Sequence, residues 1–207
     1  MKVKALLFDL GKVVVDFNFE RGTKRLAGNC GLPTEEFEKV LFDKAWIRRY
    51  ERGEISTAEY HQYLCEVGRL RISLADFHEF WSSIFLPDLL LPETLLSDLH
   101  ERYPLILVSN SNESHVDYIA RNYNVFKHFD AKIFSHVVGS LKPDRKIYEA
   151  AITASGQPAE ALFFTDDREE NILAARNLGI RAHQFTTVSL LADALRSHGV
   201  EVADQFA

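Results

Sequence analysis

Five short apolar runs, separated by stretches with helical periodicity, constrain the fold of this chain more than any other feature. Runs that are almost continuously apolar are typical of strands buried on both faces of a sheet. Alternating strands and helices predict an α/β fold with a parallel sheet and right-handed crossovers. The runs are residues 3–8, 105–108, 132–134, 161–164 and 180–183, and the helical patterns between the later runs are 92–103, 111–123, 143–154 and 168–178.

The alternation is interrupted by a long stretch after the first strand. Residues 16–87 contain no strand-like run and show the spacing of four or five amphipathic helices, for which Thr34 and Ser73 are candidate N-caps. We therefore predict two parts: a sheet-bearing core made of residues 1–15 and 88–207, and a helical insert made of residues 16–87. The proline-rich segment 86–92 would form the second of the two hinges that join the insert to the core.

Composition limits the partners of the chain. The 207 residues carry a net charge of −6, and no run of basic residues is present. Nucleic acid and anionic membranes are therefore unsuitable partners. No apolar stretch is long enough for a membrane helix, and no signal-peptide pattern is visible. We expect a cytoplasmic protein that is a monomer or a small homo-oligomer.

Chemically active side chains follow several of the predicted strands. Ligands of open α/β sheets bind beyond the carboxyl ends of the strands, so these side chains should meet at one edge of the sheet. Three carboxylates, a hydroxyl, an amide and a lysine are expected there. They are Asp9 after the first strand, Ser109 and Asn110 after the second, Lys142 before a helix, and Asp166 and Asp167 after the fourth.

This set of groups suits magnesium-assisted phosphoryl transfer. A carboxylate can attack phosphorus once the negative charges around it are compensated. Three carboxylates and a phosphate dianion against one lysine leave a net charge of about −4, which calls for a divalent cation such as Mg²⁺. The Ser109 hydroxyl and the N–H groups at the start of the next helix are donors for phosphate oxygens.

Four segments together resemble the motifs of the haloacid dehalogenase superfamily of hydrolases. They are an apolar strand ending in Asp9, an apolar strand ending in Ser109 and Asn110, Lys142 before a helix, and the acidic pair Asp166 and Asp167. The resemblance implies a Rossmann-like core with a small α-helical cap inserted at residues 16–87. Asp9-Leu10-Gly11 and the segment 51–56 further resemble the subgroup that contains glucose-1-phosphate phosphatase.

The resemblance also implies a role for each matching residue. Asp9 is the nucleophile and a magnesium ligand, and Gly11 offers its carbonyl oxygen to the metal. Asp167 is the direct acidic ligand, with Asn171 at the usual spacing, and Asp166 is an indirect or alternate ligand. Ser109 and Asn110 bind phosphate, and Lys142 bridges Asp9 and phosphate. The implied substrate is a small phosphorylated metabolite, with a sugar phosphate favoured.

Gly11 departs from the motif and leaves alternatives open. Phosphatases of this kind usually have there an aspartate that protonates the leaving oxygen, which glycine cannot do. Asp16 is a candidate replacement, although a hinge role suits it better, and Lys12 and His115 are further candidates near the site. A metal-free haloacid dehalogenase, a receiver-type signalling domain and an inactive phosphate-binding relative are the alternative functions.

Overall fold

The computed structural model describes residues 1–206 and contains the predicted five-stranded parallel sheet. Its strand order is β5-β4-β1-β6-β7, and every neighbouring pair is parallel. The strands are β1 (Ala5–Phe8), β4 (Leu105–Ser109), β5 (Ala131–Phe134), β6 (Leu162–Asp166) and β7 (Arg181–Gln184). The α/β fold class is thereby confirmed.

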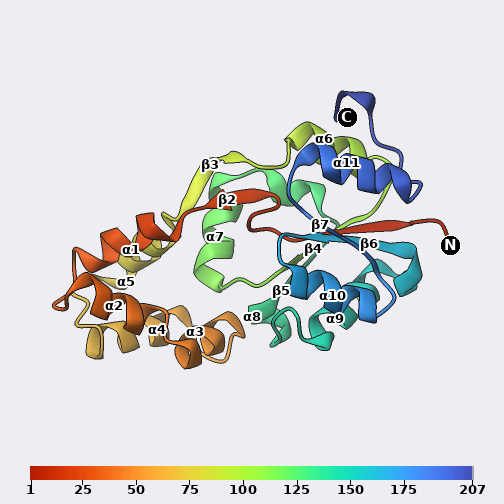
Figure 1. Ribbon diagram of the computed structural model, residues 1–207. Coiled ribbons are helices and arrows are strands. Elements are labelled where there is room, and N and C mark those ends of the chain that lie inside the picture. The colour runs from red at the N-terminus through yellow and green to blue at the C-terminus, as the bar shows by residue number, and fades with distance from the viewer. Residues whose placement is uncertain (207) are drawn as a thin grey trace.

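Helices cover both faces of the sheet (Figure 1). Successive side chains of a strand point to opposite faces, so Leu6 and Phe8 pack in one apolar cluster and Ala5 and Leu7 in another. The first cluster includes residues of α6 (Glu93–His100), α7 (Glu113–Asn122) and α11 (Val188–Ser197), and the second includes residues of α9 (Arg145–Ser155) and α10 (Glu169–Asn177). The short helix α8 spans Ser135–Val138.

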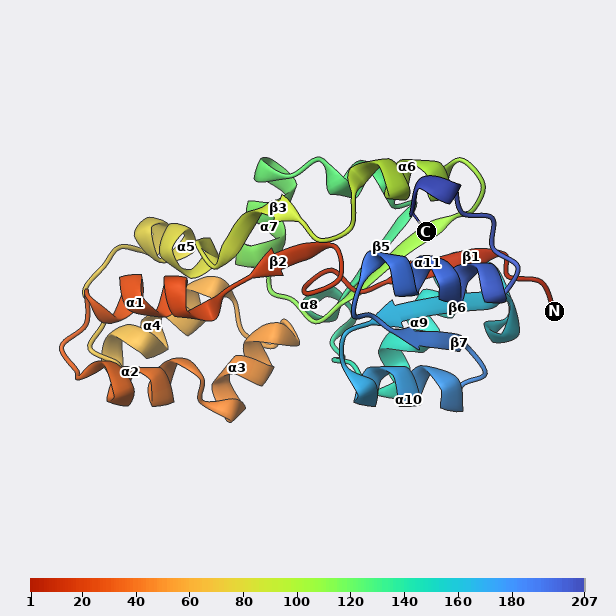
Figure 2. The same cartoon turned by 45° about the horizontal axis from the view of Figure 1, so that its top comes forward.

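The inserted residues form five helices that share their own apolar cluster. They lie beside one end of the sheet, at the side of the molecule away from the two termini (Figure 2). Tyr60 and Trp81 are fully buried within this cluster. The helices are α1 (Phe19–Ala27), α2 (Thr34–Leu41), α3 (Lys44–Glu51), α4 (Thr57–Glu66) and α5 (Leu74–Ser82).

The connection between the two parts corrects the sequence analysis. Residues 16–87 were expected to contain no strand, but β2 (Val15–Phe17) pairs antiparallel with β3 (Phe85–Leu89) and joins the core to the helices. Both strands are short, and β3 contains Pro87, so neither gives a clear sequence signal. Ser73 caps α5 as predicted, whereas Thr34 is the first residue of α2 and Pro33 stands at its cap position.

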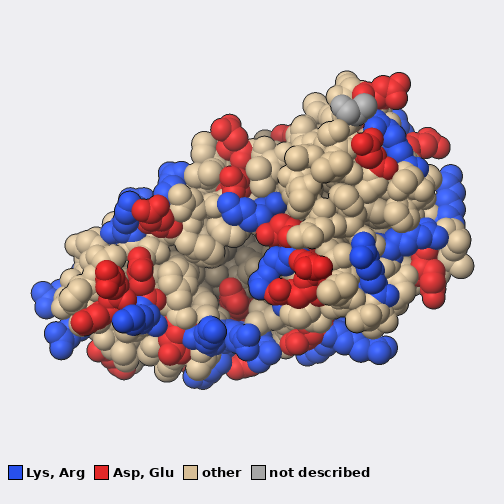
Figure 3. All heavy atoms as spheres, viewed as in Figure 1, with Lys and Arg blue, Asp and Glu red and all other residues tan. Residues whose placement is uncertain are grey.

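Several hydrogen bonds hold the helical part against the core. The Ser135 hydroxyl donates to the Glu51 carbonyl oxygen at 2.6 Å, and His78 Nδ1 lies 2.9 Å from the Ser114 hydroxyl. The surface is hollowed between the two parts (Figure 3). Within residues 1–206, no helix is long and apolar enough to cross a membrane.

Candidate active site

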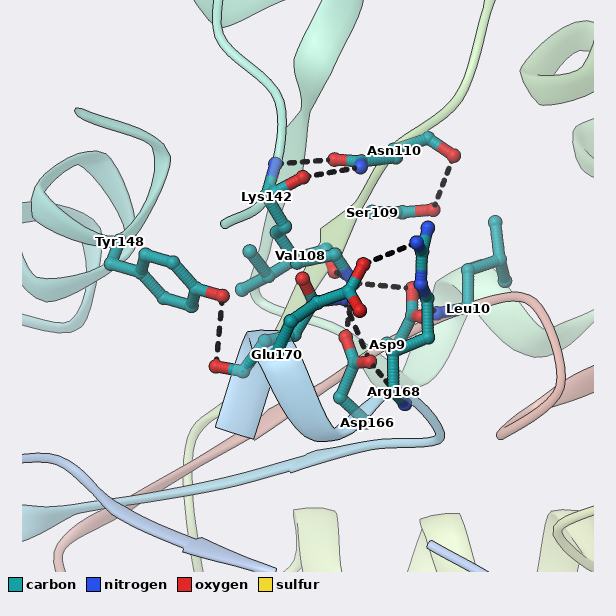
Figure 4. Close-up of polar contacts among 11 residues, drawn as sticks. Asp9, Leu10, Val108, Ser109, Asn110, Lys142, Tyr148, Asp166, Arg168 and Glu170 are labelled. Atoms are coloured by element: carbon teal, nitrogen blue, oxygen red, sulfur yellow. Dashed lines mark hydrogen bonds and ion pairs between the residues drawn. The ribbon is translucent and has the colours of Figure 1, made fainter. Parts of the chain in front are cut away.

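The carboxyl ends of the parallel strands bring the predicted site residues together. Asp9 follows β1, Ser109 ends β4 and Asp166 ends β6, while Lys142 reaches them from the loop between α8 and α9 (Figure 4). Asp9, Asp166 and Lys142 are all buried, with exposed fractions of 7%, 0% and 4%. The sequence prediction that these side chains meet at one edge of the sheet agrees with this arrangement.

Lys142 connects the two buried aspartates. Its Nζ lies 2.8 Å from Asp9 Oδ1 and 2.6 Å from Asp166 Oδ2, and it also donates to the Val108 carbonyl oxygen at 2.8 Å. Burial lowers the pKa of Lys142, but Asp9 and Asp166 together outweigh this effect and raise the pKa above its usual value. The lysine is therefore a fixed positive charge between the two carboxylates.

Asp9 keeps one carboxylate oxygen available for chemistry. Its Oδ1 accepts from the Leu10 N–H at 2.6 Å and from Lys142. Its Oδ2 has no hydrogen-bond partner among residues 1–206. Burial, with a further contribution from the charge of Asp166, raises the pKa of Asp9 to about 7, although Lys142 opposes the rise. Additional positive charge at this position would keep Asp9 ionised.

The two acidic residues after β6 have different surroundings. Both oxygens of Asp166 are engaged: Oδ2 accepts from Lys142, and Oδ1 accepts from the Asn171 side chain at 2.8 Å and the Arg168 N–H at 2.9 Å. The Asn171 side chain therefore donates its hydrogen bond to Asp166. Asp167 is only partly buried, and burial followed by the charge of Asp166 raises its pKa. Asp167 is thus the more available ligand.

The donor set fits a divalent cation. Asp9, Asp166 and Asp167 each offer an oxygen, and these oxygens lie within 4.8 Å of one another. Carboxylate oxygens are the ligands that Mg²⁺ prefers. Against these three negative charges stands only the one positive charge of Lys142 in the buried centre. Burial is the main cause of the raised pKa values of Asp9 and Asp167, and repulsion from Asp166 adds to it, so a bound cation would stabilise both ionised carboxylates.

The side chains of Ser109 and Asn110 have different hydrogen-bond partners. The Ser109 hydroxyl is buried, and its recorded partner is the Asn110 carbonyl oxygen at 3.5 Å, a weak contact that leaves it free to donate to phosphate. The Asn110 side chain binds the Lys142 backbone: it donates to the carbonyl oxygen at 2.9 Å and accepts from the N–H at 2.7 Å. Asn110 therefore positions Lys142, which the sequence analysis did not anticipate.

The loop after Asp9 has no room for an acid at position 11. A Cβ atom on Gly11 would lie 2.8 Å from Phe17 Cε1, so any side chain there displaces the Phe17 ring. The Lys12 ammonium pairs with Asp16 and donates to the Phe17 carbonyl oxygen at 2.7 Å. The hydrogen bond from Lys12 lowers the pKa of Asp16, which makes Asp16 a poor proton donor.

Glu51 is a residue of the site that the sequence analysis did not single out as functional. It ends α3 and lines the cavity that also contains Asp9, Lys142 and Asp167. Burial raises the pKa of Glu51 to about 7, and Arg168 and Arg48 oppose this only in part. Its sequence context is a run of charged residues on a helix, which gives no sign of burial.

The raised pKa of Glu51 predicts a pH-dependent loss of stability. Between the ordinary pKa of 4.5 and about 7, the folded protein holds a proton on Glu51 that the unfolded chain has lost. Stability therefore falls as the pH rises through this window. We expect Glu51→Gln to raise the Tm relative to the wild type more at pH 8 than at pH 5, as measured by thermal denaturation. Glu54→Gln, at a residue that is 48% exposed, is the matched control and should show no such difference.

A family profile identifies the class of this protein. The profile of the haloacid dehalogenase-like hydrolases matches residues 3–179, which include all four motifs. The chain therefore belongs to the haloacid dehalogenase-like hydrolases. This confirms the superfamily inferred from the apolar strands and from the residues at their ends.

Named relatives and solved structures agree with this membership. The chain is 22% identical to a sesquiterpene phosphatase of Aspergillus oryzae, over 86% of this chain and 87% of the relative. It is 21% identical to a D-ribitol-5-phosphate phosphatase of Bacteroides thetaiotaomicron, over 88% of this chain and 91% of the relative. A haloacid dehalogenase family enzyme of the same bacterium superposes with a TM-score of 0.79 at 25% identity, over 90% and 95%. A variant of that enzyme, solved with magnesium and inorganic phosphate, superposes with a TM-score of 0.78 at 25% identity, over 89% and 95%.

Proposed function

We propose that this hydrolase is a Mg²⁺-dependent phosphatase that cleaves the phosphate ester of a small metabolite. The observation that carries the proposal is the buried arrangement of Asp9, Lys142 and Asp166, in which Asp9 Oδ2 is unengaged. Asp9, the Gly11 carbonyl oxygen and Asp167 would hold Mg²⁺, with Asp166 beside them. The cation would supply charge compensation for the carboxylates and the phosphate.

Asp9 would act as the nucleophile. Its Oδ2 forms a bond to phosphorus while the bond from phosphorus to the ester oxygen breaks, and that oxygen leaves with a proton as an alcohol. Water then attacks the phosphorus of the aspartyl phosphate, which releases inorganic phosphate and restores Asp9. The Ser109 hydroxyl would donate to a phosphate oxygen, and Lys142, whose three N–H groups face Asp9, Asp166 and the Val108 carbonyl oxygen, would place its positive charge beside the phosphate. The Asn110 side chain holds the loop that carries Lys142.

The helices of residues 16–87 would serve as a cap domain over the reaction site. They contribute Phe19 and Glu51 to the cavity that contains Asp9, and such a module can exclude water during the reaction. The two phosphatase relatives act on different organic groups, one on a sesquiterpene and one on ribitol. The sugar phosphate favoured by the sequence is therefore one candidate substrate among several.

The acidic cluster favours phosphatase over dehalogenase activity. Displacement of a halide from a haloacid needs no metal, so that reaction gives no reason for a cluster of three carboxylates that could hold one. Continuous release of phosphate with Mg²⁺ from aryl and alkyl phosphates, and no chloride release from 2-chloropropionate, is the expected result. Phosphate binding without turnover would instead identify the inactive relative.

Glu51 is the carboxyl group that would replace the acid missing at Gly11. Asp16 is bound to Lys12 and has a lowered pKa, whereas Glu51 shares the cavity of Asp9 and holds its proton up to about pH 7. A proton donor accelerates departure of a poor leaving group by about 10²–10⁴-fold and matters less for a good one.

The role of Glu51 predicts a dependence on the leaving group. We expect Glu51→Gln to lower kcat/KM for hexyl phosphate about tenfold or more beyond its effect on phenyl phosphate, because hexanol is the poorer leaving group. Steady-state kinetics of the two substrates in both proteins test this. Equal losses on both substrates would show that Glu51 does not donate the proton, and Glu54→Gln should change neither rate.

A further inference from the structure

A second cavity opens beside the site and differs from it in character. It has a volume of about 280 Å³ and shares Gly11, Glu51, Ser109 and other residues with the cavity that contains Asp9. We call it the apolar cavity, because its wall is dominated by the side chains of Phe17, Phe19, Phe42, Ile47, Trp81 and Phe85. The organic group of a phosphate ester bound at Asp9 would enter this space.

Aromatic side chains on this wall remain exposed to solvent. Phe19 is 42% exposed and Phe42 is 38% exposed, and their rings meet edge to face with centroids 5.6 Å apart. Phe17 packs against Phe19 in the same way at 4.9 Å. Large aromatic groups left open in a cluster mark a surface that is covered when a ligand binds. Covering these rings would favour an apolar ligand over a hydrated one.

The amide and imidazole side chains on the wall, those of Asn110, Asn112 and His115, are engaged within the protein, whereas the Ser109 and Ser111 hydroxyls and the Glu51 carboxyl group have no close partner among residues 1–206. Asn112 caps α7 by accepting from the His115 N–H at 3.0 Å, and its Nδ2 donates to His115 Nδ1 at 3.1 Å. His115 Nε2 then donates to the Trp81 carbonyl oxygen at 3.3 Å. Burial lowers the pKa of His115 to about 3, so the ring is neutral. With Ser109 assigned to the phosphate, Ser111 and Glu51 are the free polar side chains left for the several hydroxyl groups of a sugar, and each hydroxyl left unpaired carries a cost.

We infer that the apolar cavity selects phosphate monoesters of apolar alcohols, such as alkyl, prenyl or aryl phosphates, over sugar phosphates. This inference rests on the proposed phosphatase function and assigns the substrate class of the same site. The volume of about 280 Å³ is near the lower end of small-molecule pockets, so the organic group is small. Ser109 and Lys142 hold the phosphate while the rings of Phe19 and Phe42 contact the organic group.

A chain-length series on the wild-type protein tests this inference. The substrates are ethyl, butyl and hexyl phosphate, all measured with Mg²⁺. Glucose 1-phosphate and glucose 6-phosphate represent the sugar phosphates, and phenyl phosphate tests for phosphatase activity in general. Each methylene buried in the cavity should raise kcat/KM about fourfold. We expect hexyl phosphate to exceed ethyl phosphate, and both sugar phosphates, by at least about tenfold.

Variants of the cavity wall give a second readout. Phe42→Ala should reduce kcat/KM for hexyl phosphate at least about tenfold more than for ethyl phosphate. Leu190→Ala, at a 52% exposed leucine on α11, is the matched control and should preserve the chain-length dependence. Thermal denaturation of each variant would check that it is folded. The chain-length series on the wild-type protein tests the inference independently of the variants.

The outcomes separate this inference from the function on which it rests. Equal rates for ethyl and hexyl phosphate, or faster hydrolysis of the sugar phosphates, would overturn the apolar substrate class and leave the phosphatase intact. Absence of phosphate release from every substrate, phenyl phosphate included, would instead overturn the proposed function.

Discussion

Replacing Asp9 with asparagine should lower the rate of phosphate release by more than about a thousandfold, because loss of a nucleophile usually costs at least that much. An amide is a far weaker nucleophile than a carboxylate and does not replace it as a metal ligand. Asparagine has nearly the same shape, and its side-chain oxygen can still accept from the Leu10 N–H and Lys142. The fold should therefore persist.

The comparison requires steady-state kinetics with the best substrate and a circular dichroism spectrum of each protein. Asp193→Asn, at a 65% exposed aspartate on α11, makes the same chemical change away from the site and should retain the wild-type rate. If Asp9→Asn keeps more than about a thousandth of the rate while folded, another group attacks the phosphorus.

Removal of divalent cations should abolish turnover, and Mg²⁺ should restore it. Three clustered carboxylates with one lysine leave the site negatively charged before a phosphate dianion arrives. Without a cation this repulsion opposes both substrate binding and attack, and we expect a loss on the order of a hundredfold or more. Ca²⁺ should bind but support little turnover, because its larger and looser shell can engage both oxygens of the nucleophile.

Binding of the metal can be measured without any turnover. A ligand that binds only the folded state at 100 times its Kd stabilises that state by about 2.7 kcal/mol, so Mg²⁺ should raise the Tm of the wild type. Asp167→Asn should greatly reduce this increase, whereas Asp144→Asn, at an exposed aspartate, should not. Full activity after chelation, or an unchanged Tm with Mg²⁺, would contradict a magnesium site at Asp9 and Asp167.

The sheet could be predicted because buried parallel strands leave a direct mark on the sequence. Leu6 and Phe8 face one side of the sheet and Ala5 and Leu7 the other, so the strand is apolar throughout. Strands β2 and β3 show no continuous apolar run, because Asp16 and Pro87 interrupt these short segments. Their pairing joins residues about seventy positions apart, which local patterns do not report.

Most of the candidate site could be predicted from the residues at strand ends, and Lys142 from its position before a helix. Asp9, Ser109 and Asp166 were located in this way, since each occupies the end of a strand or follows it. The hydrogen bonds between the Asn110 side chain and the Lys142 backbone, across a separation of 32 residues, could not be predicted, whereas phosphate binding by Asn110 stays a prediction. Glu51 acquires its raised pKa from packing between the helical part and the core. Such environments arise from tertiary contacts and have no local signature.

Direct detection of a phosphoryl group on Asp9 tests the central claim that this carboxylate is the nucleophile. The wild-type protein is mixed with Mg²⁺ and excess substrate, quenched in acid within the first turnovers, digested and examined by mass spectrometry. The account predicts one phosphoryl group on the peptide that contains Asp9, at the Asp9 side chain, and none in Asp9→Asn. A phosphoryl group on a different residue of an active enzyme would contradict it.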